Sequence, residues 1–226
     1  MILNIHKPAG ATSHDIVDRV RRLTGERRVG HGGTLDPFAT GVLIVAVGRE
    51  STKKLGAILK GVDKEYEATL ELGRTSTTGD PEGKIEKTAG EHRISYIPLS
   101  EIENTLREFR GKVAQTPPIY SALKVGGIRA YRLARRGEKP ALGKRQIEIK
   151  SLEIIKYHPP LLQVGIITSS GTYIRKLAED IGEKLGVGAY LVKLKRTRVG
   201  EYRLAESTNL EDLEKVLPIS DDTIHG

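Results

Sequence analysis

The chain of 226 residues contains no cysteine and no tryptophan. The absence of cysteine excludes disulfide bonds, thiolate zinc sites, iron–sulfur clusters and a cysteine nucleophile. The longest uninterrupted apolar run, Val42 to Val47, is far below the roughly 18 residues that a membrane-spanning helix needs. The N-terminal sequence MILNIHKPAG also lacks the charged-then-apolar order of a signal peptide. We therefore expect a soluble, cytoplasmic protein with no membrane partner.

Positive charge is in excess and is concentrated in one segment. The 37 Lys and Arg residues outnumber the 29 Asp and Glu residues, so the net charge is +8 and the isoelectric point is about 9.6. Residues 121–150 carry nine basic and two acidic residues, which accounts for nearly all of the net charge. A basic surface of this kind favours a polyanion as the partner.

The hydrophobic pattern predicts strands and helices that interleave along the chain. Strands are expected over residues 2–7, 42–47, 66–72, 145–157, 161–169 and 190–199, and helices from Ser13 as N-cap, over 100–109 and over 173–185. The order lacks the regular strand–helix–strand rhythm of a parallel sheet. We therefore expect an α+β fold with a mixed, largely antiparallel sheet flanked by helices. Without repeats or linkers, residues 1–226 are expected to form a single domain.

The densest candidate for chemistry is the loop GHGGTLDPFATG, residues 30–41. Its glycines let the backbone approach a ligand closely, and the loop presents His31 and Asp36. A structural alternative is that Asp36 only caps the turn before Pro37. A phosphate-binding loop is disfavoured because the GxxxxGK[ST] spacing is absent, and a metal site is disfavoured because too few ligands are present. No metal or cofactor is predicted.

The loop and four further segments carry a family resemblance. GHGGTLDPFATGVL strongly resembles the catalytic motif of the TruB family of tRNA pseudouridine synthases. The segments that resemble other family motifs, in order, are HKPAGATSHDIV (6–17), KEYEATLELGRTSTTGD (64–80), TPPIYSALK (116–124) and SSGTYIRKLAEDIGEKLGVGAYLVKLKRTRVG (169–200). The resemblance covers nearly the whole chain, and FATGVLIVAVG is more similar to the stand-alone bacterial type than to the guide-RNA-dependent relatives. It implies the pseudouridine synthase fold.

The resemblance implies an activity and a set of residues. The activity is the isomerisation of a uridine in the tRNA T-loop, conventionally position 55, to pseudouridine without a cofactor. Asp36 resembles the catalytic carboxylate, Arg175 the arginine paired with it, and Tyr173 the tyrosine proposed to assist proton removal from C5. The implied contacts to the flipped uridine are Tyr66, which stacks on the base, and Leu194, His31 and Lys53. Taken alone, Tyr66 and Leu194 would be core residues, Tyr173 an aromatic at a helix start and Arg175 a solvated side chain.

The basic segment resembles the arm with which the family closes over RNA. This basic arm, at about residues 118–146, holds the expected RNA-binding residues Lys124, Arg129, Arg132, Arg135, Arg136, Lys144 and Arg145. A solvated charged face is the alternative. Family members of this type usually continue into a small PUA module, whereas this sequence ends with LEKVLPISDDTIHG, about where that module would begin. We therefore expect no PUA domain in residues 1–226, either because the module is naturally absent or because the chain is truncated.

The resemblance implies the T stem-loop of tRNA as the partner, with no obligatory protein partner. Two other functions remain open. A catalytically idle RNA-binding protein or tRNA-folding chaperone on the same scaffold is the alternative. A glycosidase that uses Asp36 is a weaker one, because no second carboxylate is evident at the same loop.

Overall fold

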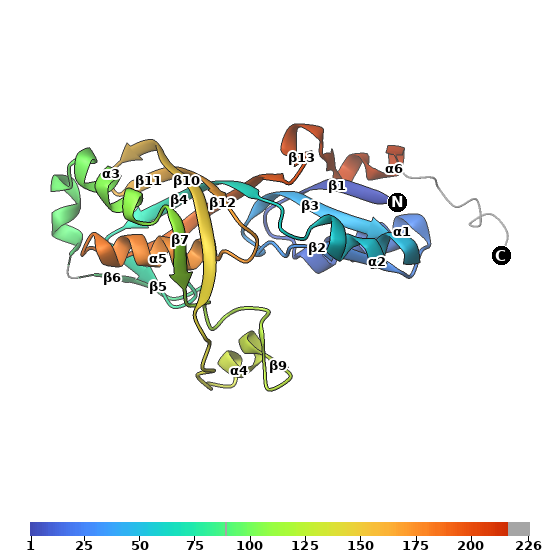
Figure 1. Ribbon diagram of the computed structural model, residues 1–226, viewed down its shortest axis with the longest axis horizontal. Helices are drawn as coiled ribbons and strands as arrows, with labels where there is room; N and C mark the ends of the chain where they lie inside the picture. The colour runs from blue at the N-terminus through green and yellow to red at the C-terminus, as the bar shows by residue number, and fades with distance from the viewer. Residues whose placement is uncertain (89, 217–226) are drawn as a thin grey trace. The chain divides into compact units, whose positions relative to one another are not determined.

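The structure of the protein is a computed structural model that describes residues 1–88 and 90–216 (Figure 1). The contacts within the chain define two units: unit 1 is Met1–Tyr66 with Leu194–Gly226, and unit 2 is Glu67–Lys193. None of the helices in the described ranges is long and apolar enough to cross a membrane. The expected absence of a PUA module concerns the C-terminal end of the chain, and residues 217–226 lie outside the described residues. The single domain over 1–226 also stays a prediction.

Unit 1 is built on a mixed sheet. Its elements are β1 (Ile2–Lys7), α1 (Ser13–Thr24), β2 (Val29–Gly32), β3 (Thr40–Val47), α2 (Arg49–Ile58), the start of β4 (Lys64–Leu72), the end of β12 (Ala189–Val199), β13 (Tyr202–Arg203), β14 (Thr208–Asn209) and α6 (Leu213–Val216). The strand order is β14-β1-β3-β12, with β2 paired to β3 and β13 to β12. β3 is antiparallel to β1 and parallel to β12.

The central strand β3 is buried on both faces. Leu43, Val45 and Val47 pack with the apolar side of α1, whereas Val42 and Ile44 pack on the opposite face with the α2 side chains. Successive residues of a strand point to opposite faces, so a continuous apolar run is what a strand covered on both sides requires. The prediction of a buried strand at 42–47 is confirmed.

The N-terminus of α1 differs from expectation by one residue. The predicted N-cap, Ser13, is wrong, because Thr12 is the N-cap and forms a capping box with Asp15. Ser13 is instead the first helical residue and is buried. Its hydroxyl accepts a hydrogen bond from the Leu35 amide at 2.9 Å and donates one to the Leu35 carbonyl at 3.0 Å. The helix start is thereby joined to the loop that carries Asp36.

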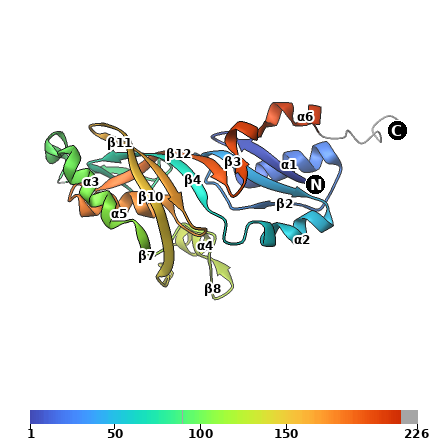
Figure 2. The same cartoon turned by 45° about the horizontal axis from the view of Figure 1, so that its top comes forward.

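Unit 2 contains a largely antiparallel set of strands. Its elements are the rest of β4, β5 (Arg74–Ser76), β6 (Ile85–Lys87), α3 (Leu99–Glu108), β7 (Gly111–Gln115), β8 (Lys124–Val125), β9 (Ile128–Arg129), α4 (Ala130–Arg135), β10 (Arg145–His158), β11 (Leu161–Thr168), α5 (Ile174–Lys184) and the start of β12. The order is β12-β4-β11-β10-β7, and β10 is antiparallel to both neighbours (Figure 2). The hairpin predicted over 145–169 and the α+β class are confirmed.

The basic arm leaves this sheet between β7 and β10. Those two strands pair antiparallel, with Gln115 opposite Arg145, so the intervening segment must begin and end at the same place. Figure 1 shows it extending beyond the ends of both strands. The arm contains the two-stranded β8–β9 ribbon and α4, whose Ala130 and Leu133 are buried. It is an ordered excursion with a small apolar interior.

Candidate active site

Asp36 lies in the loop between β2 and β3, and both of its neighbours are anchored. Leu35 is held by the buried Ser13 hydroxyl. The Pro37 carbonyl accepts hydrogen bonds from the Gly10 amide at 2.9 Å and from the Lys7 ammonium at 3.1 Å. The backbone on both sides of Asp36 is therefore held in place, and a fixed backbone is one requirement for placing a functional side chain precisely.

Lys7 ties this loop to the turn after β1. Its side chain is fully buried, and its ammonium also donates to the carbonyls of Pro8 and Ala11 at 2.8 and 2.6 Å. Carbonyl oxygens from both turns therefore converge on one cation. Sequence reasoning assigned Lys7 no role, although HKPAG, which contains it, is one of the segments that carry the family resemblance.

Arg196 anchors the other side of the loop from β12. It is 1% exposed, and its Nε and Nη2 donate to the carbonyls of Val42 and Gly33 at 2.8 and 2.9 Å. A Cβ on Gly41 would lie 2.2 Å from the Arg196 carbonyl oxygen, and the φ of Gly41 is +108°. Only glycine permits this approach of β12 to β3. Nothing in the pattern KLKRTRVG distinguishes Arg196 from the exposed cations beside it.

His31 on β2 is partly buried, and its surroundings favour the uncharged form of the ring. Burial lowers its pKa from 6.5, and the positive charges of His14 and Arg196 lower it further. Its Nδ1 is buried without a hydrogen-bond partner in the described part of the chain. The structure thus offers a neutral, aromatic ring with an unused polar atom close to the Asp36 loop in sequence.

The other predicted base contacts of unit 1 have different environments. Tyr66 and Leu194 are each 7% exposed, which agrees both with a base-binding role and with core packing. Lys53 lies on the exposed side of α2, where its ammonium is 3.6 Å from the Glu50 carboxylate. The role of each stays a prediction.

Arg175 belongs to unit 2 and is held by a buried network. Its guanidinium donates to the carbonyls of Thr78 and Tyr120, each at 2.9 Å, and its Nη1 lies 3.3 Å from Oδ2 of Asp80. The two charged side chains are only 7% and 5% exposed. The alternative that Arg175 is a solvated side chain is therefore wrong. The expected pairing with Asp36, which lies in unit 1, stays a prediction.

Asp80 and Gln115 are functional candidates that sequence reasoning missed. Asp80 Oδ1 accepts from the Thr78 hydroxyl at 2.5 Å, so the acid that faces Arg175 is itself oriented. The Gln115 side chain accepts from the Tyr173 amide at 2.9 Å and donates to its carbonyl at 3.1 Å. Tyr173 is the N-cap of α5, and this double contact fixes the backbone from which its ring projects. Asp80 ends the segment KEYEATLELGRTSTTGD, but no pattern marks Gln115.

The basic arm presents its charges to solvent. All seven predicted RNA-binding residues are exposed: Lys124, Arg129, Arg132, Arg135, Arg136, Lys144 and Arg145. The Arg135 guanidinium lies over the Tyr131 ring, 5.7 Å from its centre. A row of exposed cations on an ordered segment suits contact with phosphate groups. Contact with RNA stays a prediction.

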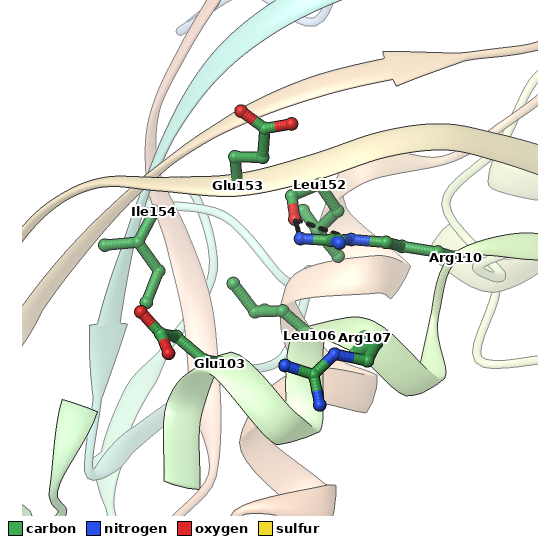
Figure 3. A pocket seen from close by; sticks show the side chains of 7 residues that line it. All are labelled: Glu103, Leu106, Arg107, Arg110, Leu152, Glu153 and Ile154. Atoms are coloured by element: carbon green, nitrogen blue, oxygen red, sulfur yellow. Dashed lines mark hydrogen bonds between the residues drawn. The ribbon is translucent and has the colours of Figure 1, made fainter. Parts of the chain in front are cut away.

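A separate pocket in unit 2 lies between α3 and β10 (Figure 3). Glu103, Arg107 and Glu153 line it, and Leu106 contributes an apolar surface. Arg110 donates two hydrogen bonds to the Leu152 carbonyl, at 3.1 and 2.8 Å, and so joins the end of α3 to β10. We assign these contacts a structural role, because they hold the end of α3 against β10. Within 1–88 and 90–216, no group of three or more His, Asp and Glu side chains could hold a metal ion.

Comparisons with known proteins agree on one family. Residues 21–174 match the model of the TruB family pseudouridylate synthase N-terminal domain, and residues 175–225 match that of the tRNA pseudouridylate synthase B C-terminal domain. The curated tRNA pseudouridine synthase B of Mycobacterium sp. (strain KMS) is 46% identical over 94% of this chain and 71% of its own length. The tRNA pseudouridine synthase B of Gloeobacter violaceus is 47% identical over 94% of this chain and 72% of its own.

Solved structures support the same fold. A chain of a Cbf5-Nop10-Gar1 complex matches with a TM-score of 0.72 and 30% identity over 95% of this chain. A chain of an H/ACA RNP bound to a substrate RNA containing 2′-deoxyuridine matches with a TM-score of 0.69 and 27% identity. The present chain spans 53% and 52% of those two chains, about half of their length. With the family models covering most of the sequence, the chain belongs to the TruB family of pseudouridylate synthases.

Proposed function

We propose that the protein isomerises the T-loop uridine of tRNA, position 55 in the usual numbering, to pseudouridine. The curated relatives that carry the name tRNA pseudouridine synthase B align over 94% of the chain. The observation that carries the assignment of Asp36 as the catalytic carboxylate is its anchored loop, in which the residues on both sides of it are held by buried polar groups. A residue that only caps a turn has no need of such anchoring.

The reaction breaks the bond between N1 of uracil and C1′ of the ribose and forms a bond from C5 to C1′. The hydrogen on C5 leaves as a proton, and N1 gains one, so no redox change or transferred group is needed. A carboxylate is suited to this chemistry because it attacks or stabilises an electron-poor sugar carbon. We assign that role to Asp36. Arg175 would keep the carboxylate ionised, and Tyr173, whose backbone Gln115 holds, would assist proton removal from C5.

The target base must leave its stack before it reaches Asp36, at a cost of a few kcal/mol. Tyr66 and Leu194 would supply the apolar walls for the flipped uracil, and neutral His31 would lie beside the nucleotide without adding charge. Lys53 is expected nearby in a supporting role. Contacts of the basic arm with the phosphates of the T stem would offset the cost of base flipping. Because tRNA is the substrate, we place the reaction in the cytoplasm.

Release of tritium from a tRNA transcript labelled at uridine C5 tests the reaction. Formation of the carbon–carbon bond expels that label into water, so the protein should release about one equivalent per tRNA, and Asp36→Asn should release none. A transcript in which the T-loop uridine is replaced by cytidine is the control for position. No release from a protein that still binds tRNA would overturn the proposal and favour an RNA-binding role.

The role of the basic arm is tested by removing three of its charges. The triple variant of Arg132, Arg135 and Arg136 to glutamine should bind tRNA more weakly and with a flatter salt dependence. The reason is that binding releases fewer counterions when phosphate contacts are lost. Its melting temperature should match that of the parent, since all three side chains are exposed. A matched control removes three exposed cations of unit 2 outside the arm: Arg107, Lys112 and Lys156. Equal salt slopes for the parent and the arm variant would contradict the assignment.

A further inference from the structure

Two cationic side chains flank Gly33 in the loop that leads to Asp36. A Cβ built on Gly33 would lie 3.3 Å from Nζ of Lys64 and 3.4 Å from Nη1 of Arg196. Lys64 is the first residue of β4, and Arg196 is a fully buried cation of β12. The two positive charges therefore adjoin the same point of the backbone, three residues before the catalytic carboxylate.

In the part of the chain that the structure describes, no acidic side chain binds either member of this pair. The Arg196 side chain donates hydrogen bonds from Nε and Nη2 to neutral carbonyls, and its Nη1 lies beside Gly33, as does Nζ of Lys64. The Lys64 ammonium forms no hydrogen bond or ion pair within the described ranges. Burial, together with the charge of Arg196, lowers the Lys64 pKa from 10.5 to about 8. A partly buried, unpaired cation beside a second cation is costly for the folded protein.

The acids next to Lys64 in the sequence are directed to a different cation. Glu65 binds Arg198 with an N–O distance of 2.6 Å. That hydrogen bond, with the charges of Glu65 and Asp63, raises the pKa of Arg198. Arg198 is thus neutralised by Glu65, whereas no acidic side chain in residues 1–88 and 90–216 pairs with Arg196 or Lys64. The contrast indicates that their counter-ion comes from outside the protein.

The position of Lys64 restricts what that anion is. Residues two apart on a strand point to the same face, so Lys64 shares a face of β4 with Tyr66 at a spacing of about 7 Å. Tyr66 is the expected stacking partner of the uracil, and one nucleotide separates its base from its phosphate by a comparable distance. The anion that accompanies a uridine of RNA to this place is a phosphodiester.

We propose that Lys64 Nζ and Arg196 Nη1 together bind the phosphodiester group next to the target uridine. The proposal rests on the proposed function and adds a phosphate contact inside the site to those of the basic arm. The bound phosphate supplies the missing negative charge and holds the ribose near Asp36. Lys64 is in this view a binding residue, with no part in the transfer of protons.

The first test is the affinity of variants for a T stem-loop RNA over a range of salt concentrations. Lys64→Met should bind roughly tenfold more weakly, and its salt slope should fall by about one unit, since one phosphate contact is lost. Lys64→Arg keeps the charge and should retain most of the affinity. Lys60→Met removes an exposed lysine a few residues earlier and serves as the matched control, with affinity unchanged. Circular dichroism of each variant checks that it is folded.

The second test identifies the phosphate. RNAs that carry a single neutral methylphosphonate are made for each position from two nucleotides before to two after the target uridine. One of these RNAs should bind the parent protein about tenfold more weakly yet bind Lys64→Met as well as unmodified RNA does, because the same contact is already lost. If every methylphosphonate weakens Lys64→Met as much as it weakens the parent, the phosphate proposal is overturned.

Other outcomes also decide the question. If Lys64→Met binds RNA like the parent but turns it over slowly in a single-turnover assay, the amine acts on the base and the proposal is wrong. Tritium release by the parent is measured on the same RNA, so failure of the proposed function is seen separately. A parent protein that binds without release would refute the isomerase assignment while the methylphosphonate scan still reports on Lys64.

Discussion

Replacing Lys64 by methionine is expected to stabilise the free protein at neutral pH. Methionine keeps the length of the side chain and removes a charge that the folded protein buries without a partner. A pKa lowered from 10.5 to about 8 corresponds to about 3 kcal/mol, at 1.36 kcal/mol per unit. Because the side chain keeps some contact with water, we expect a gain in unfolding free energy of about 1–2 kcal/mol, or roughly 2–6 °C in melting temperature.

The gain should depend on pH with a definite sign. Below pH 8 the amine is protonated in both the folded and the unfolded protein, so the full cost is present. Between pH 8 and 10.5 the unfolded chain binds the proton more tightly, so the parent gains stability relative to Lys64→Met as the pH rises. The charge of Arg196 beside Lys64 is fixed over this range, and His31, which interacts with Arg196 and whose pKa lies below 6.5, stays neutral. The difference should therefore vanish near pH 10.5.

Urea unfolding followed by circular dichroism, at about pH 7 and about pH 10, measures this difference. Lys60→Met, on an exposed position, should match the parent at both values. If Lys64→Met is less stable than the parent at pH 7, or if the difference is the same at both pH values, then the Lys64 charge carries no cost. The reasoning that assigns it an external anion would then be refuted.

Three further predictions concern groups that hold the site. Ser13→Ala removes both hydrogen bonds to Leu35 and should lower the free energy of unfolding by about 1–3 kcal/mol. Turnover should also be slower, because the Asp36 loop is less firmly held. Unchanged stability in urea would contradict this prediction. Asp80→Asn keeps the shape of the side chain but removes the charge facing Arg175, so kcat for tritium release should fall at least tenfold with little change in KM. An effect on KM alone would argue for a binding role. The His31 ring should titrate by NMR with a midpoint below 6.5. The free energy of unfolding should decrease as the pH drops below 6.5, because the unfolded chain takes up the proton first. A midpoint above 6.5 would show that burial does not govern the pKa of this ring.

Six of the strands and three of the helices were predictable because their causes are local. The alternation of β4 and the helical spacing of α1 and α5 depend on neighbours within a few residues, and the expected ranges agree with the structure to within two residues. The exchange of Ser13 for Thr12 as N-cap shows the limit of this reasoning. Both residues are able to cap a helix, and Leu35, distant in sequence, engages the serine hydroxyl instead.

The sequence by itself determined the α+β class, the loop that carries Asp36 and, through ordered motifs, membership of the family. It also placed the basic arm, because a run of unpaired cations is visible without a structure. Only the tertiary structure decided that Arg196 is buried and unneutralised whereas Arg198 is paired, since the two arginines stand two apart in the same strand with similar neighbours. A charge acquires its energy from the dielectric and the partners around it, and those are supplied by segments that meet only in the folded chain.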